Sequence, residues 1–321
     1  MKVLLLGDLH LSDKAPSGCT DSYTDDLFAL LAEAATFAVH CECVVVAGDV
    51  FHLKAPIRTS HRLVLRTIEA FRAFKVPVYV VAGNHDIQSD RLDSLLAQQP
   101  LGVVIESGAA RLLEGFTEYP VYGVPWQQHW TDEAVSEALA SYREGWGIDP
   151  RSTLVVTHAP LYPEGQELKW EHYPARKFAD AMGMSGNVFY GHVHEPHGTW
   201  GFYDEKSGVA FCNNGALSRG SLHEYNRERP VGVTIWDSET TRFEFVPLTA
   251  RPASEVLRLA EHQEHKASEQ RLDEFLSGVA AVNLAAVSAG SVLEHLKDQD
   301  GWGSEEQALA EELLAAAHGD G

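Results

Sequence analysis

Side chains that can bind metal ions follow directly after five apolar runs of this 321-residue sequence. The segments read GDLH from residue 7, GDVFH from residue 48, GNHD from residue 83, THAP from residue 157 and GHVH from residue 191. Their oxygen and imidazole donors are Asp8, His10, Asp49, Asn84, His158, His192 and His194. Grouped together, these carboxylates would repel one another and the imidazoles would be desolvated unless divalent cations lay between them. Mixed imidazole and carboxylate ligands suit manganese, iron or zinc.

Two of the segments carry donors two residues apart. Residues i and i+2 of an extended chain project to the same side, so Asp8 with His10, and His192 with His194, are each predicted to reach one metal cluster. The glycines that begin four segments are predicted to let the backbone turn sharply and approach the ions. Any one segment alone could be an unrelated polar strand end. Five in this order, each behind an apolar run, favour a single metal site.

The apolar runs are predicted to be strands covered on both faces, because their apolar residues are consecutive rather than alternating. The runs cover residues 2–6, 44–47, 78–82, 154–156 and 188–190. Apolar residues at helical spacing predict helices at 25–40 and 60–74. Alternating strands and helices indicate an α/β sheet, in which ligands bind beyond the carboxyl ends of the strands. The donors are therefore predicted to share one edge of the fold.

The later part of the chain follows a different pattern. Two β-hairpins that add antiparallel strands are predicted at 198–203 with 209–213 and at 231–236 with 242–246. Three helices separated by glycines, the first break being Gly278, are predicted at 253–277, 279–298 and 303–318. The sequence thus predicts a domain at 1–250 and a small acidic helical appendage at 251–321.

The formal net charge is −21, so the chain as a whole lacks the basic character typical of proteins that hold DNA by its phosphates. Bound divalent cations would offset several of the negative charges. The four cysteines form no Cys-x-x-Cys pair, which predicts free thiols in a reducing, cytoplasmic compartment. Neither a membrane span of about 18 apolar residues nor a signal peptide is predicted.

The ordered set GDLH, GDVFH, GNHD, THAP and GHVH resembles the calcineurin-like metallophosphoesterase superfamily over residues 1–250. The resemblance implies a four-layer α/β/β/α sandwich with two divalent ions, Mn²⁺ first and Fe²⁺, Mg²⁺ or Zn²⁺ as alternatives. It implies that one ion binds Asp8, His10, Asp49 and His194. It implies that the other ion binds Asp49, Asn84, His158 and His192. Asp49 would then bridge the two ions.

Further details resemble the SbcD/Mre-type DNA repair nucleases. His52 follows GDVF as in that branch, and NGALSRGS at 214–221 with ERP at 228–230 is similar to the branch's segment after the last motif. The resemblance implies that His85 acts on the leaving oxygen and that His52 orients His85. Ordinary packing is the alternative role for both histidines. The short region after residue 250 departs from the branch, whose typical members have a longer cap. The resemblance implies that residues 251–321 form a truncated cap or dock on a partner, and packing of their helices on the protein's own sheet is the alternative.

The leading hypothesis is a two-metal-dependent DNA exonuclease and endonuclease of repair and recombination. The resemblance implies three partners: DNA ends or single strands, an SbcC-like ATPase, and a second copy of the chain in a homodimer. The alternative is a phosphoesterase acting on a small phosphodiester or phosphomonoester, which the acidic charge favours. A metal-stabilised scaffold without activity would predict a missing ligand, and none is missing.

Aromatic and histidine residues outside the five segments have weaker interpretations. Four aromatic residues before the fourth segment could stack on bases, although packing is the favoured interpretation: Tyr122, Trp126, Trp130 and Tyr142. His197 and His223 lie either near the metal edge or, as the favoured interpretation, on the surface.

Overall fold

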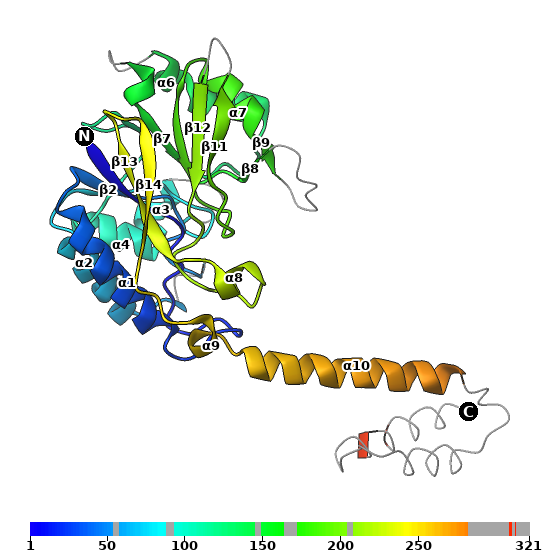
Figure 1. Cartoon of the computed structure of the whole chain (residues 1–321). Coiled ribbons are helices and arrows are strands. Elements are labelled where there is room, and N and C mark those ends of the chain that lie inside the picture. The colour runs from blue at the N-terminus through cyan, green and yellow to red at the C-terminus, as the bar shows by residue number, and fades with distance from the viewer. Residues whose placement is uncertain are drawn as a thin grey trace. The chain divides into compact units, whose positions relative to one another are not determined.

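Two six-stranded sheets pack against each other through apolar side chains, and helices cover their outer faces (Figure 1). The computed structural model describes residues 1–53, 58–87, 93–144, 149–163, 172–203, 208–281, 308–309 and 312. Both sheets belong to a unit formed by Met1–Leu259, and Ala260–Gly321 form a second unit. The four-layer α/β/β/α sandwich predicted from the sequence is confirmed.

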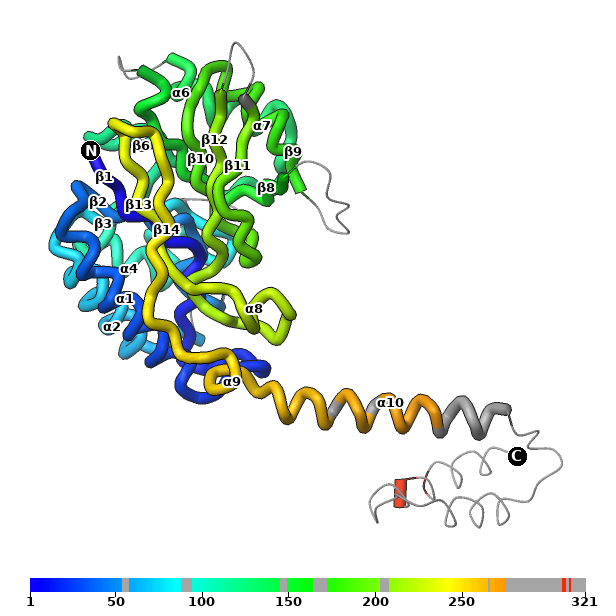
Figure 2. Tube along the Cα trace, viewed as in Figure 1, coloured from blue at the N-terminus to red at the C-terminus, as the bar shows by residue number. Residues whose placement is uncertain are grey.

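The first sheet has β1 near its centre (Figure 2). In spatial order its strands are β14 (Arg242–Pro247), β13 (Gly232–Asp237), β1 (Lys2–Leu6), β2 (Cys43–Val46), β3 (Val78–Val80) and β4 (Arg111–Leu112). Strands β1 to β4 are parallel to one another, whereas β13 pairs antiparallel with both β1 and the edge strand β14. The predicted strands and the second predicted hairpin are therefore present, with small shifts of their ends.

The second sheet is also mixed. In spatial order its strands are β11 (Gly198–Tyr203), β12 (Gly208–Asn213), β10 (Gly186–Tyr190), β7 (Leu154–Thr157), β6 (Val121–Val124) and β5 (Gly115–Phe116). Strands β12, β10, β7 and β6 are parallel, and β11 pairs antiparallel with β12 as the first predicted hairpin. Two short parallel strands, β8 (Leu161–Tyr162) and β9 (Tyr173–Pro174), form a separate small sheet.

Helices cover each sheet on the face turned away from the other sheet. The helices that contribute to the core of the first sheet are α1 (Tyr23–Ala38), α2 (His61–Ala73), α3 (Asp93–Gln98) and α4 (Pro100–Glu106). Those of the second sheet are α5 (Asp132–Ala138), α6 (Ala140–Glu144) and α7 (Ala175–Met182). A 3₁₀ turn at Pro150–Ser152 precedes β7, and the short helix α8 (Tyr225–Glu228) precedes β13. Ser60 caps α2 by accepting from the Leu63 N–H over 3.1 Å, which explains where that helix begins.

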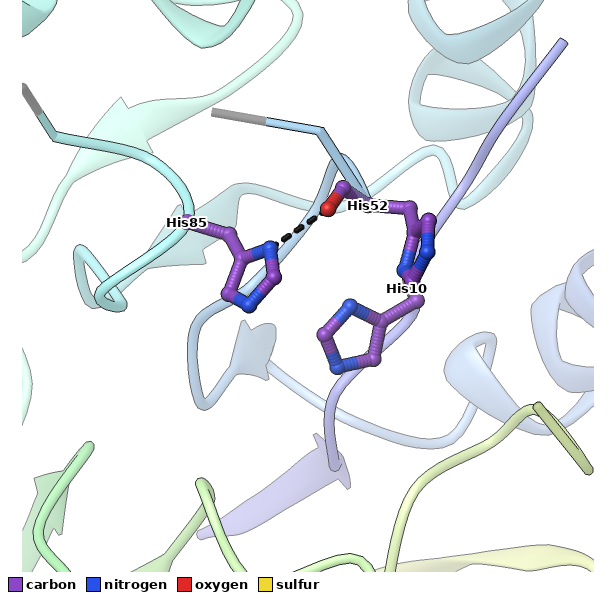
Figure 3. A group of neighbouring side chains, drawn as sticks. All are labelled: His10, His52 and His85. Carbon is purple, nitrogen blue, oxygen red and sulfur yellow. Dashed lines mark hydrogen bonds between the residues drawn. The ribbon is translucent and has the colours of Figure 1, made fainter. Parts of the chain in front are cut away.

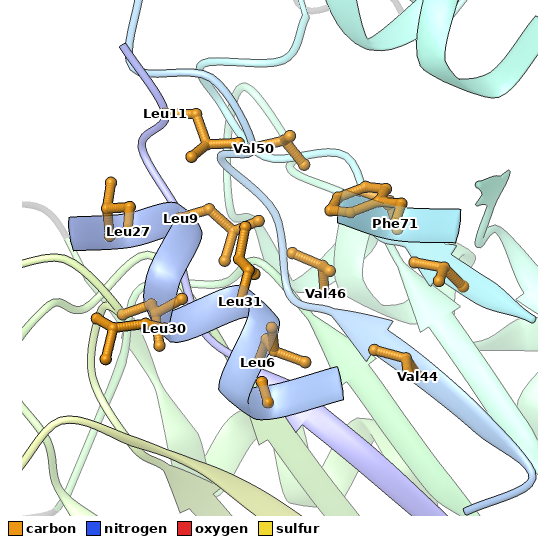
Figure 4. Close-up of a cluster of buried hydrophobic side chains, with 14 of the residues drawn as sticks. Leu6, Leu9, Leu11, Leu27, Leu30, Leu31, Val44, Val46, Val50 and Phe71 are labelled. Carbon is orange, nitrogen blue, oxygen red and sulfur yellow. The ribbon is translucent and has the colours of Figure 1, made fainter. Parts of the chain in front are cut away.

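Strand β1 shows how the layers form, because successive side chains of a strand point to opposite faces. Leu4 and Leu6 belong to the core under the helices, whereas Val3 and Leu5 belong to the core between the sheets. Figure 4 shows Leu6 among leucines of α1 and valines of β2 on the helix side. Both faces of the strand are buried, so both need apolar residues, and this gives the consecutive pattern in the sequence.

The C-terminal helices differ from their prediction at Gly278. Helix α9 (Ala253–Val256) is short, and α10 (Leu259–Ala281) then continues through Gly278. The predicted break there is wrong, because one glycine inside a helix costs only about 1 kcal/mol relative to alanine.

The predicted helices at 279–298 and 303–318 fall mostly outside the described residues. The division at residue 250 stays a prediction; the unit that contains the sheets extends to Leu259. Within the described part of the chain, no helix combines the length and the apolar character that crossing a membrane requires.

Candidate metal centre

The seven predicted donors lie in five loops that follow β1, β2, β3, β7 and β10. The first three strands belong to one sheet and the last two to the other. Four donors are almost completely buried: Asp8, His10, Asp49 and His158. The other three are partly buried: Asn84, His192 and His194. The structure brings all seven together where the carboxyl ends of the two sheets meet, as the distances between their donor atoms show.

The first donor group consists of Asp8, His10, Asp49 and His194. Nε2 of His194 lies 3.2 Å from Asp8 Oδ2 and 2.9 Å from His10 Nε2. Nε2 of His10 also lies 3.6 Å from Asp49 Oδ2. The donor atoms thus converge in the combination that the family resemblance implies for one ion.

The second donor group consists of Asp49, Asn84, His158 and His192. Nε2 of His158 lies 3.5 Å from Asp49 Oδ1 and 3.1 Å from Asn84 Oδ1. Nδ1 of His192 lies 3.2 Å from the same Asn84 oxygen. Asp49 therefore faces the first group with Oδ2 and the second with Oδ1, which is the geometry expected of a bridging carboxylate.

The chemistry of both groups fits divalent cations. Among the described residues, the ion-pair partners of the buried carboxylates of Asp8 and Asp49 are histidines. Burial lowers the pKa of His10 to about 3, and burial together with a neighbouring histidine lowers the pKa of His192 to about 4. Both rings are therefore neutral, which is the form that binds a metal. Cations would also relieve the close approach of the facing ring nitrogens of His10 and His194.

His158 shows the opposite pKa shift. Burial would lower its pKa, but the carboxylates of Asp49 and Asp8 raise it to about 9. Burial would likewise raise the pKa of Asp49, yet His158 holds it well below its usual range. The protein's own groups thus compensate part of the carboxylate charge, and bound cations would take over that role.

Three donors have left-handed backbones, and here the prediction from extended geometry is wrong. The φ angles are +50° at His10, +50° at Asp49 and +70° at His192. Each such conformation costs of order 1–3 kcal/mol and persists only where the surroundings fix it. The His10 N–H donates to the Asp49 carbonyl over 2.8 Å, and the His192 N–H donates to the Asp8 carboxylate over 3.0 and 3.1 Å. The paired donors therefore reach the centre through tight turns.

Two glycines allow the sheets to approach closely at the centre. Gly48 has φ +102°, and a Cβ there would lie 2.2 Å from His158 Nδ1. A Cβ at Gly191 would lie 2.2 Å from the Ala47 carbonyl oxygen. The same carbonyl accepts a hydrogen bond of 2.6 Å from His158 Nδ1, which directs Nε2 of that ring into the second donor group. Gly48 thus provides the predicted turn, whereas Gly191 is required for close packing.

His85 and His52 form a pair beside the donors (Figure 3). His85 Nδ1 donates to the His52 carbonyl over 2.5 Å, and the two rings stack with centroids 5.9 Å apart. The His85 N–H donates to Asp49 Oδ1 over 2.8 Å, and Nε2 lies 4.0 Å from Asp49 Oδ2. The His85 side chain is 27% exposed, so it is partly open to solvent. One of its ring nitrogens is therefore held in place, and the other faces the bridging carboxylate.

Two residues outside the predicted set also support the donors. Asp86 accepts from the Val50 and Gly83 N–H groups over 3.0 Å each and so joins two donor loops. Burial and the nearby Asp49 raise the pKa of Asp86 to about 7. The Tyr23 hydroxyl donates to the His10 carbonyl over 3.0 Å. Asp86 could have been noticed as the last residue of GNHD, whereas nothing in the sequence around Tyr23 marks its role.

The remaining aromatic and histidine residues divide between core and surface. Tyr122 and Tyr142 are buried in the core of the second sheet, in agreement with the packing interpretation. The ring centroids of Trp126 and His192 lie 4.8 Å apart, so Trp126 packs against a donor. His197 Nδ1 is 2.7 Å from the Tyr190 hydroxyl, and the exposed His223 ring stacks on Tyr225. Neither histidine belongs to a donor group formed by the described residues.

Comparison with known proteins identifies one family and several relatives. The family model described as calcineurin-like phosphoesterase matches residues 1–196. A probable cyclic nucleotide phosphodiesterase of Psychrobacter arcticus is 20% identical over 296 residues, which cover 85% of this chain and 94% of that protein. The 3',5'-cyclic adenosine monophosphate phosphodiesterase CpdA of Haemophilus influenzae is 27% identical over 226 residues, or 66% of this chain and 77% of that protein.

A third relative matches over a shorter stretch. The DNA double-strand break repair protein Mre11 of Archaeoglobus fulgidus is 32% identical over 84 residues. These residues cover 26% of this chain and 19% of that protein. The similarity to a repair nuclease is thus higher in identity and much lower in coverage than the similarity to the two cyclic nucleotide phosphodiesterases.

Proposed function

This chain belongs to the calcineurin-like phosphoesterase family and is a metal-dependent phosphoesterase, and we propose that it hydrolyses the phosphodiester bond of a small nucleotide. The bridging geometry of Asp49, which faces both donor groups, carries the assignment of two-metal phosphoester chemistry. The substrate is supported by the two cyclic nucleotide phosphodiesterases matched over most of their length. The net charge of −21 also favours a small substrate over a polyanion.

The first and second donor groups would each hold one divalent ion. Carboxylate, amide and imidazole donors suit Mn²⁺ first, with Fe²⁺, Mg²⁺ or Zn²⁺ as alternatives. Ions bound there supply Lewis-acid chemistry, because they neutralise phosphate charge and acidify water. Asp49 fixes the distance between the two groups, and the Ala47 carbonyl fixes the ring of His158.

His85 supplies the proton in this proposal. Hydrolysis joins a water oxygen to phosphorus and breaks the bond to the leaving oxygen. The leaving oxygen takes a proton from His85 Nε2, and the proton that the attacking water loses restores the protonated ring for the next turnover. The His52 carbonyl holds Nδ1 of the same ring, and the His52 ring stacks on it, so Nε2 keeps a constant direction. General acid catalysis of this kind contributes roughly 10²–10⁴ in rate.

The second function is the DNA nuclease predicted first from the sequence. It is supported by the position of His52 after GDVF, which resembles the SbcD/Mre-type branch, by the stacking of His52 on His85, and by the Mre11 match. Action on DNA ends or single strands, an SbcC-like ATPase partner and a homodimer belong to this second proposal.

One assay separates the two substrates. The purified protein with Mn²⁺ is given cyclic AMP, bis-p-nitrophenyl phosphate, and linear and single-stranded DNA in parallel. We expect both small diesters to be hydrolysed, whereas both forms of DNA should remain intact. Degradation of DNA with cyclic AMP left whole would reject the small nucleotide in favour of the nuclease. Failure on every diester would overturn both functions.

Matched histidine variants test the chemistry in the same assay. His85→Ala is expected to lose roughly 10²–10⁴-fold in rate while still binding Mn²⁺. His40→Ala is the control, because His40 is exposed and precedes β2, at the end opposite to Asp49. Equal rates for the two variants would contradict the role of His85.

A further inference from the structure

Asn213, the last residue of β12, lies beside the loop that carries His192 and His194. Strands β10 and β12 are neighbours in the second sheet (Figure 2). They are parallel, with Phe189 opposite Cys212, so both strands end at the same edge of the sheet. Only 1% of Asn213 is exposed. The residue is therefore enclosed at the same sheet edge as the donors.

The side chain of Asn213 makes hydrogen bonds through both of its polar ends. Its Nδ2 donates to the Tyr190 carbonyl over 2.9 Å and to the Val193 carbonyl over 3.1 Å. Its Oδ1 accepts from the Gly215 N–H over 2.9 Å and from the His197 N–H over 3.4 Å. One amide thus joins the end of β10, the residue between the two donor histidines, and the loop beyond them.

The chain that follows Asn213 continues this support. The Ala216 N–H donates to the His194 carbonyl over 3.2 Å, and the Leu217 N–H donates to the Asp8 carbonyl over 2.8 Å. Asn213 sets the position of this segment through its bond to the Gly215 N–H. Loss of the amide would therefore disturb backbone next to donors of both groups.

We propose that Asn213 is a positioning residue that holds His192 and His194 in the geometry required to bind metal. The inference rests on the proposed metal role of these two histidines. His192 belongs to the second donor group and His194 to the first, so the Asn213 amide positions one donor of each group. Removing it leaves the buried carbonyls of Tyr190 and Val193 without their donor, and the loop must shift to satisfy them.

Asn187 provides a matched control on the neighbouring strand β10, at the end away from the donors. It is also buried, and its Nδ2 also donates to two carbonyls, those of Arg151 at 2.7 Å and Thr153 at 3.2 Å. Asn187 lies at the start of β10, whereas Asn213 lies beside its end. The two asparagines therefore share burial and a pair of Nδ2 hydrogen bonds to carbonyls, but they lie at opposite ends of neighbouring strands relative to the donors.

The test measures Mn²⁺ binding by calorimetry on metal-free, full-length protein, with urea unfolding of each variant in parallel. We expect Asn213→Ala to weaken Mn²⁺ binding roughly 10–100-fold, the usual effect of losing a partner that orients a metal ligand. Asn187→Ala should lose comparable stability and keep wild-type affinity. Unchanged affinity in Asn213→Ala, or equal weakening in both variants, would overturn the proposal.

A milder variant and the wild type complete the design. If Asn213→Ala does not fold, Asn213→Ser keeps a hydroxyl donor and is expected to show a smaller loss of affinity; wild-type affinity in a folded Asn213→Ser would reject the role. Absence of Mn²⁺ binding by the wild type would overturn the proposed function together with this inference. Binding by the wild type with unchanged Asn213 variants would overturn the inference alone.

Discussion

The two sheets contribute unlike chemistry to the centre. The first sheet supplies both carboxylates, Asp8 and Asp49, together with Asn84 and His10, whereas the second supplies imidazoles alone. By itself the first sheet would present two buried negative charges, and the second would present three rings without an anionic partner. Neither half is an acceptable binding site alone, so the centre depends on contacts between the sheets.

Those contacts join the backbone of one sheet to side chains of the other. The His192 N–H donates to the Asp8 carboxylate, and the His158 ring donates to the Ala47 carbonyl. The left-handed turn at His192 is fixed by its bond to Asp8 of the other sheet, whereas the turn at His10 is fixed by the Asp49 carbonyl of its own sheet. The packing of the two sheets therefore contributes to the geometry of the donors, while each sheet sets their types.

Removal of the shared carboxylate should have the largest effect. Asp49→Ala takes a donor from both groups, so phosphodiesterase activity should fall by more than the roughly 10–100-fold that follows loss of an outer partner of a ligand. Hydrolysis of bis-p-nitrophenyl phosphate and the number of Mn²⁺ ions bound measure it. Asp25→Ala, an exposed aspartate paired with Arg66, is the control. Two bound ions in Asp49→Ala would show that the carboxylate does not bridge.

Metal should stabilise the junction between the sheets. Mn²⁺ at 100 times its dissociation constant should add about 2.7 kcal/mol to the free energy of unfolding, by mass action at one site. Thermal unfolding with and without Mn²⁺, and after chelation, measures this effect. The increase should be smaller in Asp49→Ala. An equal increase in both proteins would place the ions away from the junction.

A methyl group between the sheets should be costly. The Cβ of Gly191→Ala would meet the Ala47 carbonyl and would also lie 2.5 Å from Oδ1 of the donor Asp8. The sheets must therefore separate, at a cost of about 1–3 kcal/mol for overpacking. The Cβ of Gly220→Ala would lie 3.4 Å from the Ser218 hydroxyl and 3.7 Å from the Tyr23 hydroxyl, which are ordinary contacts, so this variant should be nearly neutral. Urea unfolding compares the two variants. Equal stability of the two variants would show that the two sheets can separate at little cost.

Protonation of His197 at acidic pH should lower the free energy of unfolding by a smaller amount. Burial lowers the pKa of His197 from 6.5 to about 4. Between pH 4 and pH 6.5 the ring is therefore protonated in the unfolded chain and neutral in the folded protein. Its contribution to stability is complete above pH 6.5 and is lost as the pH falls toward 4. His197→Gln should flatten this part of the stability profile, and the exposed His40→Gln should leave it unchanged. Identical profiles for wild type and His197→Gln would exclude the effect.

Much of the fold was predictable because local patterns have local causes. Strand β1 was predicted with its observed bounds, since a strand buried on both faces needs consecutive apolar residues. The break at Gly278 was wrong because the prediction treated a modest local penalty as decisive. The extended geometry assigned to Asp8 and His10 failed for a different reason: hydrogen bonds from another loop hold His10 in a turn.

The sequence by itself determined the order of strands and helices, the types of the seven donors and their place at strand ends, because these depend on residues close together in the chain. The tertiary structure alone decided that Asp49 faces both groups, that His158 donates to Ala47, and that Asn213 and Asp86 support donor loops. These contacts join residues distant in sequence, and their geometry depends on how closely the two sheets pack. No local pattern encodes that distance.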